Sequence, residues 1–242
     1  MPRGYRDYGI AAPSSYTFPI VSWEDYFMRQ GLIKTLDGKG DIIFFDSFEE
    51  GLSKWFQQAG AGDNYIELSP DHARGGNWAL KFNLAGTAWS SVTAAATIPV
   101  AKPNRFGFES NFVMRAEYSC PAWFLYYYDL TKYYHFGVRY RGDTKKLQYW
   151  APPDTWTDFA DVEWELEPLY YFHPVKLVID ATKLEYVKFI CRGNEYDLSG
   201  LKSPWDTLRV RRAIQPRFMW TLISGEYFPS YLDDVIVTTN EP

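Results

Sequence analysis

Three glutamates at alternate positions, Glu163, Glu165 and Glu167, are the residues of this chain best placed to do catalysis. On a β-strand, side chains two residues apart point to the same side, at steps of about 7 Å. Two carboxylates held in this way could act as nucleophile and general acid in glycoside cleavage. Pro168 follows at once, however, and a central strand tolerates proline badly. An exposed polar edge strand explains the same residues, and we prefer it.

Other catalytic patterns are missing from the sequence. It has no Gly-x-Ser-x-Gly elbow and no glycine-rich phosphate loop, and its three histidines form no pattern with the cysteines that has zinc spacing. Cys120 and Cys191 could form a disulfide or remain as two buried free thiols. We therefore predict that the chain is not an enzyme, with glycoside hydrolysis by the glutamate row as the alternative.

Aromatic residues make up 19% of the chain and often stand next to one another in the sequence. Because neighbouring side chains on a strand point to opposite sides, one ring of each adjacent pair must face away from the core. Such rings can stack on sugars or pack against another subunit. They can also be covered by the chain's own N-terminal segment. The candidate ligand-binding residues are Trp123, Tyr126, Tyr128, Trp150 and Trp156.

From Asp41 onward, the hydrophobic pattern is that of successive β-strands. Tyr134, Phe136, Val138 and Tyr140, for example, alternate with glycine, polar and basic residues. A hairpin turn is predicted at residues 141–144. The pattern predicts an all-β fold, a two-sheet antiparallel sandwich of roughly a dozen strands, with no helices between them to suggest a parallel sheet.

The N-terminal 40 residues follow another pattern. Residues 1–21 have no hydrophobic period but carry several aromatic rings, which predicts an extended arm that docks on its own domain or on a neighbour. A short helix is expected from Ser22, a possible N-cap, to Gln30, before Gly31. The expected organisation is therefore an arm and helix over residues 1–40 and a sandwich domain over residues 41–242.

Charge and hydropathy exclude several classes of partner. The net charge is -5, which argues against nucleic acid, because phosphate binding needs clustered lysine and arginine. We find no signal peptide and no apolar stretch long enough for a membrane helix. We therefore expect a protein made in the cytosol and placed on a virion surface, or an extracellular one if another route exports it.

Two segments resemble jelly-roll carbohydrate-binding modules. The first is Phe45 to Trp55, read FDSFEEGLSKW, followed by ARGGNWAL at residues 73–80; the second is YLDDVIV at residues 231–237. Residues 172–180 and 192–198 look like strands of concanavalin-A-like and laminin-G-like domains. The glutamate row resembles the E-x-D-x-E strand of concanavalin-like endoglucanases, with Glu165 in place of the central Asp. The resemblance implies a jelly-roll sandwich over residues 41–239.

The same resemblance implies a structural calcium ion where the first and last strands of the sandwich lie side by side. Its ligands would be Asp46, Glu49 and Asp234, with a backbone carbonyl near Gly75. Asp234 is expected on the same strand face as the apolar Leu232 and Ile236. The alternative is that Asp234 accepts hydrogen bonds or pairs with an arginine.

Three functions fit these observations. The one we favour narrowly is a non-catalytic structural protein of a phage or virus particle, a capsid decoration or tail component, whose arm and outward rings bind other subunits as an oligomer or contact capsid and tail proteins. The second is a carbohydrate-binding module that recognises a polysaccharide through surface Trp and Tyr. The third is a concanavalin-like glycoside hydrolase.

Overall fold

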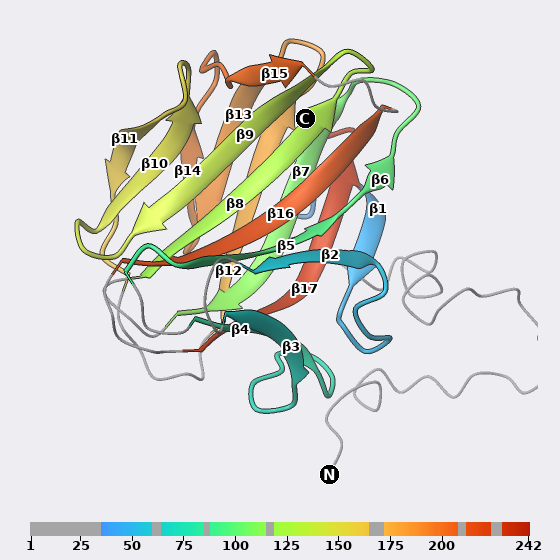
Figure 1. The fold of residues 1–242 in the computed structure, drawn as a ribbon. Coiled ribbons are helices and arrows are strands. Elements are labelled where there is room, and N and C mark those ends of the chain that lie inside the picture. The colour runs from blue at the N-terminus through green and yellow to red at the C-terminus, as the bar shows by residue number, and fades with distance from the viewer. Residues whose placement is uncertain are drawn as a thin grey trace, which may run out of the picture.

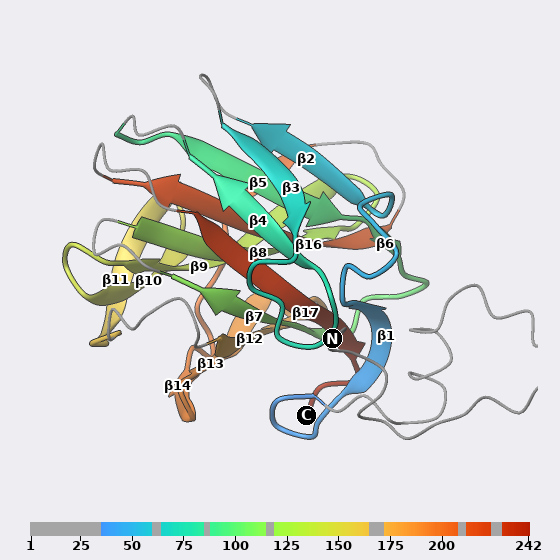
Figure 2. The ribbon, with the colours of Figure 1, turned by 90° about the horizontal axis from the view of Figure 1, so that it is seen from below.

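Two antiparallel β-sheets packed face to face form the described part of the chain (Figures 1 and 2). The computed structural model describes residues 35–59, 64–84, 88–114, 119–164, 172–207, 212–223 and 229–242. Within these ranges the regular elements are all strands, which confirms the predicted all-β sandwich. The predicted arm and helix before residue 35 lie outside the described residues. The described residues contain no helix of the length and apolarity that a membrane crossing requires.

The eight-stranded sheet has a long central pair, β7 and β17. From one edge its order is β14 (Asn194–Asp197), β13 (Glu185–Cys191), β12 (His173–Asp180), β7 (Arg105–Val113), β17 (Ser230–Thr239), β4 (Ala79–Asn83) and β3 (Tyr65–Ser69), with β1 (Asp41–Asp46) on the second half of β17. The first and last strands of the sandwich are therefore neighbours, as the resemblance implied.

The nine-stranded sheet faces the viewer in Figure 1. From one edge its order is β11 (Thr155–Asp161), β10 (Lys146–Ala151), β9 (Lys132–Arg141), β8 (Ser119–Tyr128), β16 (Ala213–Leu222), β5 (Ser91–Ala96) and β2 (Trp55–Ala59), with β15 (Trp205–Thr207) on β9 and β6 (Ile98–Pro99) on β16. The predicted hairpin turn lies between β9 and β10. Cys120 on β8 and Cys191 on β13 are both free and buried.

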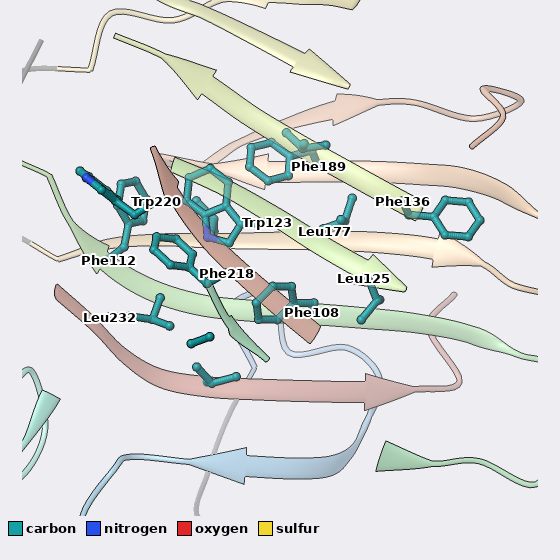
Figure 3. Packing of buried hydrophobic residues seen from close by; sticks show 14 of the residues in the cluster. Phe108, Phe112, Trp123, Leu125, Phe136, Leu177, Phe189, Phe218, Trp220 and Leu232 are labelled. Carbon is teal, nitrogen blue, oxygen red and sulfur yellow. The ribbon is translucent and has the colours of Figure 1, made fainter. Parts of the chain in front are cut away.

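Aromatic side chains fill the space between the two sheets (Figure 3). The predicted alternating row of β9, from Tyr134 to Tyr140, is buried there. Near the centre, the ring of Trp123 lies 4.8 Å from Phe112 and 5.7 Å from Phe218, measured between centroids. Edge-to-face contacts of this kind stabilise a core beyond the effect of area burial, by about 1 kcal/mol each.

The outer face of the eight-stranded sheet is covered by a charged cluster. Lys176, on β12, is fully buried; its Nζ lies 2.6 Å from Asp37 Oδ1 and 2.8 Å from Glu241 Oε1. Glu109, on β7, accepts a hydrogen bond of 2.8 Å from the backbone N–H of Leu36. Residues just before β1 and just after β17 are thus tied to this face by ionic groups, which must stay paired because they are buried.

Glu109 makes this cluster sensitive to pH. Its burial raises its pKa to about 7, from an ordinary value of 4.5. Between these two pH values the folded chain binds more protons than the unfolded chain, so stability falls as the pH rises through that window, by up to about 3 kcal/mol. Glu109→Gln should flatten this slope, because glutamine keeps an acceptor for Leu36 but does not titrate. Urea denaturation across the window measures the effect.

The matched control is Glu195→Gln, which removes an exposed carboxylate that pairs with Lys188 on the same sheet. This control should leave the slope between the two pH values as it is in the original protein. If stability changed equally with pH in the Glu109→Gln variant and in the original protein, Glu109 would not be the group that causes the pH dependence.

Candidate functional site

The outer face of the nine-stranded sheet carries an uninterrupted group of aromatic rings on four adjacent strands. We call this group the aromatic face. Its members alternate with the inward-pointing core residues of the same strands. They are Phe124, Tyr126 and Tyr128 on β8, Tyr133 and His135 on β9, Trp150 on β10 and Trp156 on β11.

At one end of the aromatic face, four rings form a continuous stack. Tyr126 and His135 are cross-strand partners, with centroids 4.7 Å apart and planes at 9°. The imidazole also stacks on Tyr133, at 4.4 Å, and Tyr133 in turn stacks on Tyr128 at 5.5 Å. Cross-strand aromatic pairs of this kind hold one another in fixed orientations.

His135 is the titratable residue within this stack. Its Nε2 is buried and has no hydrogen-bond partner among the described residues. Burial lowers its pKa, against the opposing effect of the Asp154 and Asp206 carboxylates. The lowered pKa favours the neutral imidazole at pH 7, which packs as a flat aromatic ring against Tyr126 and Tyr133.

At the other end, two tryptophans and a phenylalanine meet. Trp150 and Trp156 are cross-strand partners with centroids 4.9 Å apart, and Phe124 lies 5.7 Å from Trp156. The phenylalanine ring lies directly on Gly137, where a Cβ would come within 2.4 Å of a ring carbon. Only glycine leaves room for this ring.

Buried Tyr186 supports the aromatic face from the opposite sheet. Its hydroxyl accepts a hydrogen bond of 2.8 Å from Gly137 N–H and lies 2.8 Å from the carbonyl oxygen of Trp150. One hydroxyl thus joins β9 to β10 directly beneath the rings. This contact fixes the backbone of a ring-bearing residue from inside the core.

Glutamine and arginine side chains frame the rings. Gln215 on β16 accepts hydrogen bonds from Tyr128 Oη, at 3.0 Å, and from Arg217 Nε, at 2.8 Å. On the other side, Gln148 on β10 accepts one of 2.7 Å from Arg139 Nε. The face thus combines half-buried rings with fixed polar groups, the usual composition of a ligand site.

A pocket of about 590 Å³ lies near the tyrosine end of the aromatic face. Its walls include Pro152 and Pro153 from the β10–β11 turn, and Lys202 and Trp205 from the segment around β15. Asp154, which acts on the His135 pKa, also lines it, so the pocket and the ring stack are close.

Four of the five predicted ligand-binding residues belong to the aromatic face: Tyr126, Tyr128, Trp150 and Trp156. The prediction for Trp123 is wrong, because this residue is fully buried between the sheets and donates a hydrogen bond of 3.1 Å to Ser110 Oγ. In the pair Trp123-Phe124 it is the phenylalanine that faces outward. Nothing in the pair itself says which ring faces the core.

The sequence analysis missed Tyr133, His135, Arg139 and Arg217 as members or neighbours of the aromatic face. Each of these side chains points away from the core, on a strand whose alternate residues face the core. The available signal was the strand alternation of β9, which places Tyr133, His135 and Arg139 opposite the recognised core row.

The carboxylates assigned to calcium have hydrogen-bond donors as partners. Asp46 is fully buried and accepts bonds of 2.8 Å from Phe48 N–H and 2.7 Å from Trp55 Nε1. Glu49 accepts three bonds, from the backbone N–H groups of Asn77 and Trp78 and from the Asn77 amide. These donors present hydrogen atoms to the oxygens, so the arrangement suits an acceptor role better than cation binding.

Asp234 pairs with an arginine, which was the alternative to calcium binding: its Oδ2 lies 2.9 Å from Arg74 Nη1. The expectation that it shares a strand face with Leu232 and Ile236 is wrong. A β-bulge interrupts β17 here, with Asp234 at φ 48°, so the core side continues through Val235 and Val237. An inserted residue shifts the alternation by one position.

The neighbouring Asp233 is the buried acid of this pair, which the sequence analysis did not single out. It accepts hydrogen bonds from the backbone N–H groups of Arg74, at 2.7 Å, and of Asp234, at 2.8 Å. Burial and the adjacent Asp234 carboxylate raise its pKa. In the described part of the chain, no three His, Cys, Asp or Glu side chains group as a metal site would require, and calcium binding stays a prediction.

The glutamate row is only partly within the described residues. Glu163 lies beyond the end of β11, is exposed, and forms an ion pair with Lys145 that lowers its pKa. A general acid for glycoside cleavage needs the opposite shift. Glu165 and Glu167 lie outside the described residues.

Comparison with known proteins identifies the fold. No model of a known protein family matches the chain, and no curated protein sequence does either. Among solved structures, a protein of unknown function with a galectin-like fold from Bacillus subtilis has a TM-score of 0.56 at 12% identity, over 83% of this chain and 97% of the other.

Two further structures are similar to the same extent. The endo-beta-1,4-glucuronan lyase from the fungus Trichoderma reesei has a TM-score of 0.55 at 12% identity, over 82% of this chain and 96% of the other. The cellulose induced protein Cip1 has a TM-score of 0.53 at 12% identity, over 81% and 96%. Such distant likeness shows the fold alone, and it confirms a concanavalin-like jelly-roll sandwich.

The carboxylates around Asp46 and Glu49 yield a prediction on calcium. Because N–H donors occupy these oxygens, we expect the same thermal unfolding midpoint with excess EDTA and with millimolar calcium, measured by differential scanning calorimetry. A ligand that binds only the folded chain stabilises it, so an unfolding midpoint that rises with calcium concentration would mean that calcium binds the folded chain. The carboxylates would then have to rearrange around the ion. Magnesium at equal ionic strength is the control.

Proposed function

We propose that this chain is a non-catalytic binding protein that recognises a polysaccharide on the aromatic face of its nine-stranded sheet. The observation that carries the proposal is the continuous set of rings from Trp156 on β11 to Tyr128 on β8, in which Trp150, Trp156, Tyr126, Tyr133 and His135 are half-buried and Phe124 and Tyr128 are buried. The rings lie on strands of a rigid sheet rather than on loops, so they form a preorganised surface.

The chemistry of this surface suits sugar rings. A pyranose ring has an apolar side formed by its C–H groups, which packs on an aromatic ring, while its hydroxyls need hydrogen-bond partners at the edge. Here Trp150 and Trp156 offer the ring surfaces. Gln148 and Gln215, held by hydrogen bonds to arginines, offer amide groups beside them.

The structural neighbours support a carbohydrate ligand without deciding it. One of them acts on glucuronan by its name, and another is a cellulose induced protein. The fold is shared by enzymes and by proteins of unknown function, so the absence of catalysis is part of the proposal. It is supported by Glu163, whose lowered pKa and exposed position do not suit a general acid.

The assembly function favoured from the sequence depends on residues 1–21, which lie outside the described residues. It stays a prediction, and the two roles are compatible if the same protein displays its aromatic face on a particle. Polysaccharide binding stands ahead of it because the residues that would bind are described and are seen to lie together.

Trp156→Ala tests the proposal. Trp156 contacts Phe124, Trp150 and Arg139, so its removal takes away the centre of one end of the aromatic face. We expect binding to the preferred glycan to weaken roughly tenfold or more, as for a central aromatic residue of an interface. Affinity gel electrophoresis over a panel of soluble neutral and acidic polysaccharides first identifies the ligand, and titration calorimetry then measures the affinity.

The matched control is Tyr65→Ala. Tyr65 is 48% exposed on β3, at the edge of the opposite sheet, and should not affect binding. Circular dichroism and the unfolding midpoint confirm that both variants are folded. If the original protein binds no polysaccharide of the panel, or if the two variants lose affinity equally, the aromatic face is not a glycan-binding site.

A further inference from the structure

Two arginines lie on the aromatic face, one toward each end. Arg139 on β9 places its guanidinium carbon 4.3 Å from the ring centroid of Trp156. Arg217 on β16 places its own 4.4 Å from the ring centroid of Tyr126. Both side chains are half-buried. Stacking on a ring holds each guanidinium in a fixed plane above the sheet.

Neither guanidinium has an acidic partner among the described residues. The described arginines in ion pairs are Arg74, Arg105 and Arg141. Arg139 and Arg217 instead donate through Nε to the neutral amides Gln148 and Gln215.

Nearby acidic groups have other roles. Asp158 on β11 pairs with Lys146 and accepts a bond from Gln148, and Asp206 accepts one from Tyr133 Oη. Cys120, close to Arg139, has its pKa raised to about 11 by burial, so it is a neutral thiol at pH 7. The more distant Asp143 favours the charged form of Arg139, but no carboxylate of the described residues lies within ion-pair distance of either guanidinium.

Such an arrangement is unfavourable without an anion. A half-buried cation loses part of its hydration, and a cation–π contact offsets only part of that loss without neutralising the charge. Elsewhere in the described chain, Lys176 and Lys188 show the usual solution, with carboxylates at ion-pair distance. Arg139 and Arg217 are less buried than these lysines, and no described carboxylate lies at ion-pair distance from either of them.

We infer that the ligand of the aromatic face is an acidic polysaccharide, whose uronate carboxylates bind Arg139 and Arg217 while its sugar rings pack on the half-buried Trp150 and Trp156. This inference rests on the proposed function and specifies its ligand. The Nε of each guanidinium is bound to a glutamine amide, so a carboxylate would bind through the Nη groups, in short charge-assisted hydrogen bonds.

The spacing of the two arginines indicates a polymer rather than a single sugar acid. β8 lies between β9 and β16, so the two arginines are separated by two strand spacings, about 10 Å. In register, Arg217 lies opposite Phe124 and Arg139 opposite Ala122, which adds a shift along the strands. This backbone separation favours two carboxylates on successive residues of a chain over one carboxylate that bridges both guanidiniums.

The test compares a polyuronate, polygalacturonate or alginate, with a neutral β-glucan of similar length, by titration calorimetry on the full chain. We expect tighter binding of the polyuronate, with an affinity that decreases as salt is added. Arg217→Gln should weaken polyuronate binding roughly tenfold or more, because a charge-assisted hydrogen bond is lost. The loss of affinity should be larger for the polyuronate than for a neutral glycan, because only the carboxylate interacts with the positive charge. Arg217→Lys should recover only part of the loss, because lysine lacks the planar fork.

Arg192→Gln is the matched control, since it removes one positive charge from an exposed turn of the other sheet. It should bind polyuronate as the original protein does. If Arg192→Gln and Arg217→Gln weakened polyuronate binding equally, the effect would come from net charge alone. That result would overturn the inference. Preference for the neutral glucan, or for a sulfated glycan without uronate, would also overturn it while leaving the proposed function in place. Binding of no glycan at all would remove the proposed function itself.

Discussion

The alternation of side chains on paired strands is the constraint on which this structure depends. Because each sheet has one face in the core, every strand divides its residues into a buried row and an outward row. Trp123, Phe112 and Phe218 meet between the sheets, and the neighbours of these residues in sequence must face away. A chain this rich in aromatic residues therefore places rings on its outer surface as a consequence of filling its core.

The two outer faces are used differently. On the eight-stranded sheet, the segment before β1 and the residues after β17 cover the surface, and buried Lys176 is neutralised by Asp37 and Glu241. On the nine-stranded sheet, the described residues leave half-buried rings and two arginines without acidic partners. On the first face Lys176 and Lys188 are paired with carboxylates, whereas on the second no described carboxylate lies at ion-pair distance from either arginine.

Where β1 pairs with β17, the motif that resembles carbohydrate-binding modules is present, but its acidic residues have other partners than the resemblance implied. The DD pair of the last strand is present, but a bulge at Asp234 turns the strand and buries Asp233 instead. The carboxylates of Asp46, Glu49 and Asp233 accept N–H groups of the adjoining loops, and so fix the 74–78 segment and the turn after β1. Burial of an acid beside another acid is tolerated because these donors are present.

The sequence by itself determined the fold class, the row of β9 that faces the core, the β9–β10 turn and four of the residues on the aromatic face. These follow from local rules, since a period of two and a turn signal act within a few residues. Only the tertiary structure decided that Trp123 is buried, that Asp234 pairs with Arg74, and that Arg139 and Arg217 share one face with Trp156 and Tyr126. Such facts depend on register and on bulges between strands far apart in the chain, where a shift of one residue moves a side chain to the other side of the sheet.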